Sequence, residues 1–316
     1  MKLKLLPLFL VIPLTACQQS PALESKVFCI DTVVEIKLSE GNKEDLTELK
    51  KIFTYYDQIS DNYQAREISN VYTINQTSDE VVVDKELYDL LKVSFDVKNE
   101  GANYFNPLCG SLVKKWKESL KNQQILAENT INEELLKINS SSISFKEDNK
   151  IKRVGEAEID LGGIAKGYAL DMAKSYLDSK SISKYLLNAG SSSTMLGEKK
   201  SKDGLFTVGL RDLEGSYPKL KNCVISTSGI DVQGVTIDGV TYSHIINPIT
   251  GSAINNYDAV VVISEKGYLG DALSTSMMMN TIDEIKTIET EHNVKTLVIK
   301  DKKIVYQNEG IEVYHR

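Results

Sequence analysis

Asp271 and Thr275 carry oxygen atoms and stand four residues apart in the segment GDALSTSMMMN. On a helix this spacing puts both side chains on one face. A carboxylate with a hydroxyl suits a magnesium ion, which takes few protein oxygens and fills its shell with waters and substrate phosphates. The alternative is that Asp271 caps the helix and Thr275 bonds back to its own turn. The pair indicates a metal site only if other segments converge on it.

A glycine-rich stretch, IDLGGIAKGYALD, is the second candidate for chemistry. It lacks the spacing of a Walker loop and of the dinucleotide fingerprint. Gly162 and Gly163 would still let a phosphate or a flat ring approach the backbone, and a helix beginning near Ile164 would point free N–H groups at an anion. Lys166 adds a positive charge in the first turn, where a structural helix would favour an acid. The alternative is a tight connection from a strand to a helix.

His244, in the segment YSHIINPITG, is the candidate proton acceptor. It follows a β-rich run and precedes a turn at Asn247–Pro248, and a histidine at such a place can serve as a general base. The alternative is a structural imidazole with satisfied hydrogen bonds.

Aromatic residues beside two turns are candidates for stacking on a planar ligand. They are Tyr63, after Asp61–Asn62, and Tyr104 and Phe105, before Asn106–Pro107. The alternative is that they belong to the core. The sequence holds no GxSxG elbow and no HExxH motif, so Ser226–Gly229 is read only as a polar loop.

Helices and strands that would position these residues follow from the periodicity of apolar side chains. Helices are predicted at 45–60, at 85–101 with a stop at Gly101, at 111–123 and at 270–280. Strands are predicted at 31–38, 143–158, 185–187, 206–210 and 259–264. Hairpins are predicted at 235–246, around Asp238–Gly239, and at 296–307.

The order of these elements predicts an α+β fold. Strands and helices mix without a regular βαβ alternation and no internal repeat is found, so we expect one domain at 29–316. It would have two intertwined lobes of mixed or antiparallel sheet with packed helices.

The first residues, MKLKLLPLFLVIPLTACQQS, have a basic start and an apolar run too short to span a bilayer as a helix. Residues 1–16 therefore indicate a secretory signal. Leu14–Cys17 resembles a bacterial lipobox, which predicts lipidation of Cys17 and a tether at 17–28. The alternative is an ordinary signal peptide with an incidental cysteine.

Composition excludes several other classes of protein. A net charge of −7 argues against a nucleic-acid partner, which would favour a basic face. The cysteines after Cys17 are Cys29, Cys109 and Cys223; they are scattered and show no CxxC spacing, which argues against a zinc site or a disulfide framework.

Taken together and in order, these motifs resemble the ApbE family of flavin transferases, over nearly the whole chain from about Cys29 to about Lys300. The residues that carry the resemblance are Ile30–Thr32 (where the family tends to have Met-Gly-Thr), Ile59–Ser60, Tyr63, Glu67–Ser69, Tyr104–Pro107, Asp160–Tyr168, Asn188–Gly190, Thr227–Gly229, His244–Pro248, Thr250–Gly251 and Asp271–Thr275.

The resemblance implies an enzyme that binds FAD and Mg²⁺, joins FMN to a threonine or serine hydroxyl of an acceptor protein, and releases AMP. The acceptor would be an exported or membrane-associated electron-transfer protein, on the side of the membrane to which a lipidated Cys17 would anchor the enzyme.

The same resemblance implies the roles of single residues. The metal would be held by the side chains of Asp271 and Thr275 and by the carbonyl of Ala165. His244 would take the acceptor's proton. The residues expected to bind the flavin nucleotide are Ile30, Tyr63, Tyr104, Phe105, Asn106, Gly162, Lys166 and Ile245.

Two rival functions stay open at this point. The first is an FAD pyrophosphatase, in which water replaces the acceptor hydroxyl. The second is a flavin-binding lipoprotein without activity. The chain lacks an Asp-x-x-[Ser/Thr]-Gly-Ala-Thr acceptor motif, so it is not expected to flavinylate itself.

Overall fold

A computed structural model describes residues 22–190, 192–210, 213–230 and 234–315. The predicted signal at 1–16 and the predicted lipidation of Cys17 lie outside these residues. The predicted tether at 17–28 needs correction, because strand β1 already begins at Leu23. Val27 packs against the main hydrophobic core, and this burial makes the segment part of the folded body.

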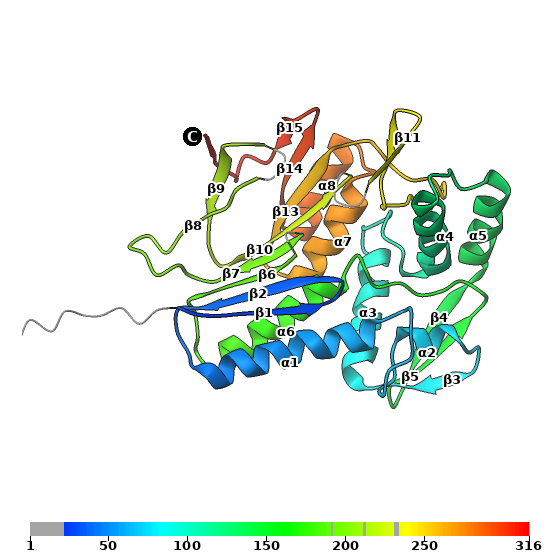
Figure 1. The fold of residues 1–316 in the computed structure, drawn as a ribbon, viewed down its shortest axis with the longest axis horizontal. Helices are drawn as coiled ribbons and strands as arrows, with labels where there is room; N and C mark the ends of the chain where they lie inside the picture. Colours follow the sequence, from blue (N-terminus) through cyan, green and yellow to red (C-terminus); the bar gives the residue numbers. More distant parts are fainter. Residues whose placement is uncertain (1–21, 191, 211–212, 231–233, 316) are drawn as a thin grey trace, which may run out of the picture.

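A single eight-stranded sheet forms the centre of the protein (Figure 1). Every pairing between its strands is antiparallel. In spatial order the strands are β1 (Leu23–Cys29), β2 (Thr32–Leu38), β6 (Tyr185–Ala189), β7 (Ser193–Leu196), β10 (Cys223–Gly229), β13 (Ala259–Ser264), β14 (Lys295–Lys300) and β15 (Lys303–Gln307).

Helices and small strands cover the two faces of this sheet. On one face lie the helices α1 (Lys43–Ser60), α6 (Ala165–Ser179), α7 (Gly267–Met277) and α8 (Ile282–His292). On the other lie the short strands β8 (Phe206–Thr207), β9 (Ser216–Leu220) and β16 (Val313–His315). Successive β13 residues alternate between two hydrophobic clusters, Val260 and Val262 in one and Val261 and Ile263 in the other. That two-sided burial explains the unbroken apolar run of β13.

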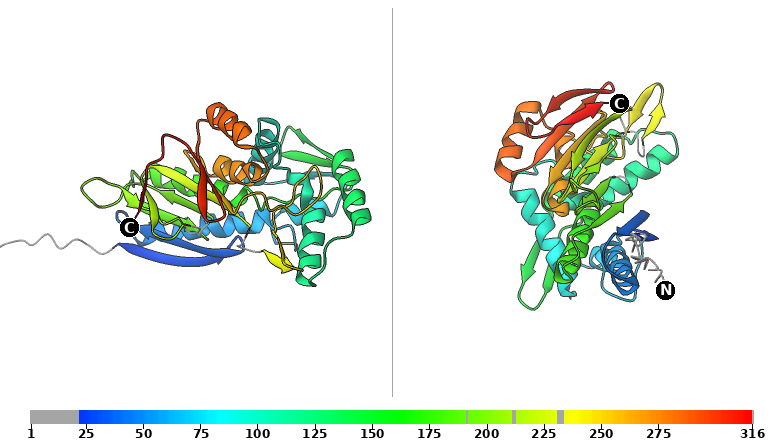
Figure 2. Two further views of the ribbon diagram at one scale, coloured as in Figure 1. Left: turned by 90° about the horizontal axis from the view of Figure 1, so that it is seen from above. Right: turned by 90° about the vertical axis from the view of Figure 1, so that its left-hand side faces the viewer.

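A second lobe is inserted between α1 and α6 (Figures 1 and 2). It contains α2 (Val71–Asn75), α3 (Lys85–Asn99), the 3₁₀ helix η1 (Pro107–Cys109), α4 (Gly110–Lys121), α5 (Glu128–Ser140) and the sheet of β3 (Glu80–Val82), β4 (Ser142–Lys146) and β5 (Lys150–Val154).

The two lobes are intertwined, because the hairpin of β11 (Val235–Ile237) and β12 (Val240–Tyr242) returns from the second half of the chain to α4. The rings of Trp116 and Tyr242 stack with centroids 6.4 Å apart. The indole N–H of Trp116 donates to the carbonyl of Gly251 at 2.7 Å. The predicted α+β fold with two intertwined lobes is confirmed.

Most predicted elements are present, with two corrections. Ser226–Gly229, read as a polar loop, belongs to strand β10, because it pairs with β13 in the sheet. Helices α1, α3, α4 and α7 and the hairpins β11–β12 and β14–β15 lie where periodicity places them, and Gly101 follows α3 with a φ of +116°. The single strand predicted at 143–158 is instead the hairpin β4–β5, which turns at Asp148 and Asn149 with positive φ. None of the helices within the described ranges has the length and apolarity to span a bilayer.

Candidate active site

Helices α6 and α7 cross with their backbones in direct contact. A Cβ atom added to Gly167 would lie 2.1 Å from the carbonyl oxygen of Gly267, and one added to Gly267 would lie 2.3 Å from the oxygen of Gly167. No side chain fits at either position, so both glycines are required for this approach. The crossing brings the glycine-rich stretch at the start of α6 to the helix that carries Asp271 and Thr275.

Asp271 is buried at this crossing and accepts three hydrogen bonds. Its Oδ2 accepts from the backbone N–H of Gly167 at 2.7 Å. Its Oδ1 accepts from the hydroxyls of Ser193 and Ser226, each at 2.7 Å. Burial raises the pKa of the Asp271 carboxyl above its ordinary value, and the positive charge of Lys166 opposes that rise. A further cation bound beside the carboxylate would, like Lys166, favour its charged form.

Two neighbouring strands supply the serines. Ser193 of β7 and Ser226 of β10 are paired directly in the sheet, so both project from the same face toward α7. Ser228, two residues further along β10, lies on that face as well; its hydroxyl is 3.0 Å from that of Ser274 and 3.3 Å from that of Thr275. A row of hydroxyls on β10 thus faces one side of α7.

Thr275 lies one turn beyond Asp271 and faces the glycine turn. Its hydroxyl donates to the backbone carbonyl of Asp271 at 3.1 Å, which is the bond expected of a structural threonine. A Cβ atom added to Gly163 would nevertheless lie 3.6 Å from the Thr275 hydroxyl oxygen. Thr275 is thus tied to its own helix and also close to the glycine turn.

The donor set at the crossing fits a hard divalent cation. It offers one carboxylate and several hydroxyls, all oxygen, as magnesium prefers. Ala165 is buried at the first position of α6, two residues before Gly167. Within the described ranges, no three His, Cys, Asp or Glu side chains gather as a metal cage would need. An ion at Asp271 would complete its shell with oxygens from water or substrate.

Lys166 connects this region electrostatically to His244. The Nζ of Lys166 lies 3.4 Å from the carbonyl of Gly162. Burial first, then the charges of Lys117 and Lys166, lower the pKa of His244 to about 4. Its Nδ1 is buried and has no hydrogen-bond partner in the part of the chain that the structure describes. His244 is therefore neutral at neutral pH, and its Nδ1 does not take part in a protein hydrogen bond.

The loop that carries His244 is held by its own polar side chains. The hydroxyl of Ser243 accepts from the backbone N–H of Ile245 at 3.1 Å and donates to its carbonyl at 3.0 Å. The side chain of Asn247 accepts from the N–H groups of Ile249 and Thr250. Ile245 itself is buried in the main core.

The predicted aromatic residues divide into exposed and buried ones. Tyr63 is 51% exposed, and its hydroxyl lies 3.1 Å from the Nζ of Lys117. Tyr104 is half-buried, and its backbone N–H donates to the hydroxyl of Ser276 on α7 at 3.2 Å. Phe105 is buried, and its ring lies 3.1 Å from a Cβ atom built on Gly163. All but Tyr63 lie against α7 or the glycine turn.

Asn106, Gly162 and Ile30 take part in local turns. The side chain of Asn106 accepts from the N–H of Leu108 and so caps η1. The N–H of Gly162 donates to the carboxylate of Asp160 at 2.6 Å. Ile30 and Asp31 form the β1–β2 turn with φ of 50° and 54°. Residues other than Gly, Asn and Asp rarely adopt this left-handed backbone conformation, so the backbone at Ile30 is strained.

Sequence inspection missed three contributors to the site, which are Ser193, Ser226 and Lys117. A serine within the apolar run of β10 is a signal for Ser226, because a buried hydroxyl requires a partner. No comparable signal marks Ser193 or Lys117, since their roles depend on which elements lie beside them.

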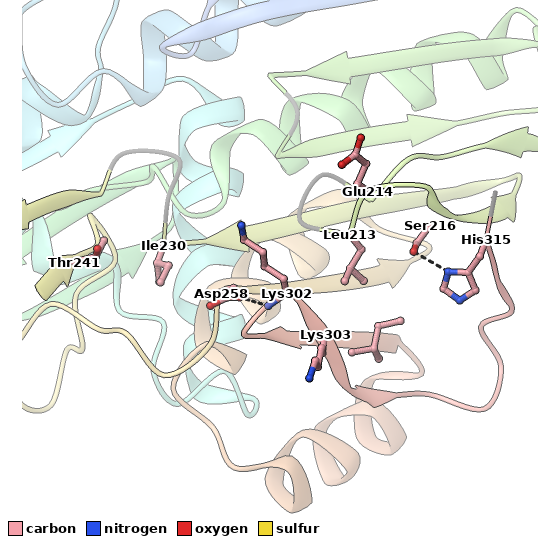
Figure 3. Close-up of a pocket in the computed structure, with 10 residues that line it drawn as sticks. Leu213, Glu214, Ser216, Ile230, Thr241, Asp258, Lys302, Lys303 and His315 are labelled. Atoms are coloured by element: carbon pink, nitrogen blue, oxygen red, sulfur yellow. Dashed lines mark hydrogen bonds between the residues drawn. The ribbon is translucent and has the colours of Figure 1, made fainter. Parts of the chain in front are cut away.

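A cavity of about 1040 Å³ lies elsewhere on the molecule (Figure 3). Ser216 and His315 hydrogen-bond at one end of it, and the backbone N–H of Lys302 donates to Asp258 nearer its middle. None of the site residues predicted from the sequence lines this cavity. We therefore place the candidate site at the α6–α7 crossing.

Comparison with known proteins gives consistent matches. The model of the ApbE family matches residues 30–298. An FAD:protein FMN transferase of Treponema pallidum is 27% identical over 217 residues, which are 62% of this chain and 60% of that protein. One from Rhodobacter capsulatus is 25% identical over 229 residues, 68% of this chain and 42% of that protein. The matches thus span about half the length of these curated relatives. The ApbE protein of Thermotoga maritima has a similar fold, with a TM-score of 0.80 and 24% identity over 91% of this chain and 97% of that one.

Proposed function

The chain belongs to the ApbE family, and from this we propose that it is an FAD:protein FMN transferase. The acceptor hydroxyl of a threonine or serine attacks the phosphorus of the FMN half of FAD. The new bond joins the acceptor oxygen to that phosphorus, the bond to the AMP phosphate breaks, and AMP leaves. The observation that carries this proposal is the contact of the Asp271 carboxylate with the backbone of the glycine-rich stretch at Gly167.

Asp271 and Thr275 would hold a magnesium ion together with the carbonyl of Ala165. When bound, the ion supplies positive charge that offsets the charge of the diphosphate. The protein orients the Asp271 carboxylate through the Gly167 N–H and the hydroxyls of Ser193 and Ser226. Lys166, whose charge opposes the rise in the pKa of Asp271 and contributes to the lowered pKa of His244, would bind the nucleotide's phosphates.

His244 would accept the proton of the attacking hydroxyl at a ring nitrogen. Its depressed pKa keeps the imidazole neutral, as a proton acceptor must be. The buried Ile245 beside it, with Ile30, Tyr63, Tyr104, Phe105, Asn106 and Gly162, would contact the flavin nucleotide. This assignment is supported by the position of Phe105 against Gly163 and by the bond from Tyr104 to α7.

We also propose that Cys17 is lipidated and anchors the enzyme to the outer side of a cell membrane. Only residues 18–22 separate Cys17 from β1. Five residues span at most about 18 Å, so the folded body would stay close to the membrane surface. An exported or membrane-bound electron-transfer protein would be within reach as the acceptor.

The deciding experiment incubates the protein with FAD, Mg²⁺ and an acceptor that carries a threonine flavinylation motif. We expect the intact mass of the acceptor to rise by one FMN, with an equal amount of AMP. AMP and FMN formed without a change in acceptor mass would mean a pyrophosphatase, and FAD bound without AMP would mean a carrier protein. Either result contradicts the proposal.

An Asp271→Asn variant tests the metal assignment in the same assay. Asparagine keeps a hydrogen-bonding oxygen, whereas alanine would leave three buried donors without an acceptor, at about 1–3 kcal/mol each. We expect transfer to fall about 100-fold or more, since the charge that holds the ion is lost. Asp283→Asn, on an exposed acid of α8, is the matched control and should keep full activity. Full activity of Asp271→Asn with normal folding contradicts the assignment.

A further inference from the structure

The first turn of α7 is capped by an acid from another helix. The preceding residue, Lys266, supplies no side-chain cap. Instead the backbone N–H groups of Gly267 and Tyr268 donate to the two carboxylate oxygens of Asp171, at 2.7 and 3.0 Å. Asp171 lies on α6, 96 residues before Gly267. A negative charge at a helix N-terminus satisfies free N–H groups and complements the helix dipole.

A second hydrogen bond of the same kind joins the two helices, with the donor on α6 and the carboxylate on α7. Asp271 of α7 accepts from the N–H of Gly167 on α6, as Asp171 of α6 accepts from the N–H of Gly267 on α7. In both helices the glycine precedes the aspartate by four residues, so the two lie on one face. The backbones of the two glycines are in contact between them.

A short sequence pattern underlies this exchange. GYALD at 167–171 and GYLGD at 267–271 share a Gly-Tyr-x-x-Asp pattern, a recurrence too short to detect as a repeat from the sequence. The rings of Tyr168 and Tyr268 also meet, with centroids 6.3 Å apart. The two segments form a pseudo-symmetric crossing in which each aspartate fixes the other helix.

The two aspartates differ in what surrounds them. Asp271 accepts hydroxyls from the sheet and lies one turn before Thr275. Among the described residues, the Asp171 carboxylate accepts hydrogen bonds only from the N–H groups of Gly267 and Tyr268 on α7. The Asp171 carboxylate thus contacts α7, and no described serine of the sheet donates to it.

We propose that Asp171 is a positioning residue, which holds the first turn of α7 against α6 so that the Asp271 carboxylate meets the glycine-rich stretch. In treating Asp271 as a metal ligand, this inference rests on the proposed function. Burial, with a further contribution from the charge of Asp271, raises the pKa of Asp171 to about 6, against the opposing effects of the two N–H groups and Lys266. The two carboxylates therefore influence each other across the crossing.

Hydrogen exchange at the Gly167 amide tests the proposal directly. The amide is protected by its bond to Asp271, so it reports whether α7 still sits against α6. We expect Asp171→Ala to speed exchange of peptides covering 165–170 by about tenfold or more, because local opening exposes this bond. Asp171→Asn, which keeps one acceptor oxygen, should give an intermediate rate and keeps the test valid if the alanine variant folds poorly.

Asp45→Asn is the matched control. Asp45 is a buried acid that likewise caps a helix, since the N–H of Asn42 donates to it at 2.8 Å. It contacts α6 through the hydroxyl of Tyr176. This variant should lower the melting temperature without changing exchange at Gly167. Unchanged exchange at Gly167 in both Asp171 variants overturns the proposal.

Magnesium dependence separates this inference from the proposed function. If α7 is displaced, Asp171→Asn should need about tenfold more Mg²⁺ for half-maximal transfer. Its melting temperature should rise less on addition of Mg²⁺ than that of the wild type. Its kcat at saturating Mg²⁺ should stay near that of the wild type. A wild-type protein without any Mg²⁺ response contradicts the metal assignment alone, because the exchange result still decides the role of Asp171.

Discussion

At the scale of single residues, the charges around His244 set the pH range in which it can accept a proton. Its burial and the nearby cations Lys117 and Lys166 lower its pKa from 6.5 to about 4. A base acts in its neutral form, so lowering the pKa extends activity toward acid. We expect the acid limb of kcat/KM to lie near pH 4 to 5, measured from initial rates of AMP release across pH.

A Lys117→Met variant tests whether the nearby cations lower the pKa of His244. Removing one cation should raise the pKa of His244 and move the acid limb to higher pH, by about half a unit to one unit. Lys121→Met, on an exposed lysine of the same helix, should leave the limb in place. An acid limb near pH 6.5 in the wild type, which is the ordinary value of histidine, would mean that burial and the two lysines do not lower the pKa of His244.

At the scale of elements, the contact between α6 and α7 determines where the functional groups meet. Both helices present glycine at the crossing, and a methyl group at Gly167 would overlap the backbone of Gly267. Glycine inside a helix ordinarily costs about 1 kcal/mol relative to alanine. The close approach of the backbones explains why this helix keeps it.

Gly167→Ala should therefore destabilise the protein even though alanine favours helices. We expect the clash to cost about 1–3 kcal/mol beyond the gain in propensity, with a lower melting temperature by calorimetry. Gly209→Ala is the control, since an added Cβ atom there meets no described residue within 4 Å. An unchanged or higher melting temperature for Gly167→Ala would show that the helices can separate at no cost.

At the scale of the whole molecule, the first described strand, β1, forms one edge of the central sheet. β1 pairs with β2 over its full length, from Leu23 opposite Leu38 to Cys29 opposite Thr32. It also packs on α1, which in turn packs on α6. Through this chain of contacts the first strand supports the helix that begins at the glycine turn.

A chain that begins at Ile30 should consequently fold poorly, whereas one that begins at Ala22 should fold well. Removing β1 uncovers the edge of β2 and the part of the core against Val27. We expect a lower melting temperature and aggregation in size-exclusion chromatography. Phe28→Ala, at an exposed side chain of the same strand, should shift stability by no more than about 0.5 kcal/mol. If the two chains were equally stable, β1 would not be needed for folding, and the tether predicted at 17–28 would hold.

Several features of this protein were determined by the sequence alone, because they depend on neighbours within a few residues. The apolar stripe of α1, the buried run Ala259–Ser264 and the turn at Asp238–Gly239 each carry a local signal. The motifs around Gly162, His244 and Asp271 also indicated the family correctly.

Only the tertiary structure decided how those parts meet. Gly167 and Asp271 are 104 residues apart, and their hydrogen bond exists because two glycines let α6 and α7 touch. Ser193 and Ser226 reach the same carboxylate because β7 and β10 pair in one register. Burial and long-range hydrogen bonds depend on which elements become neighbours, and no local pattern in the sequence encodes that choice. The segment that begins at Leu23 is a strand for the same reason, because it pairs with β2 over its full length.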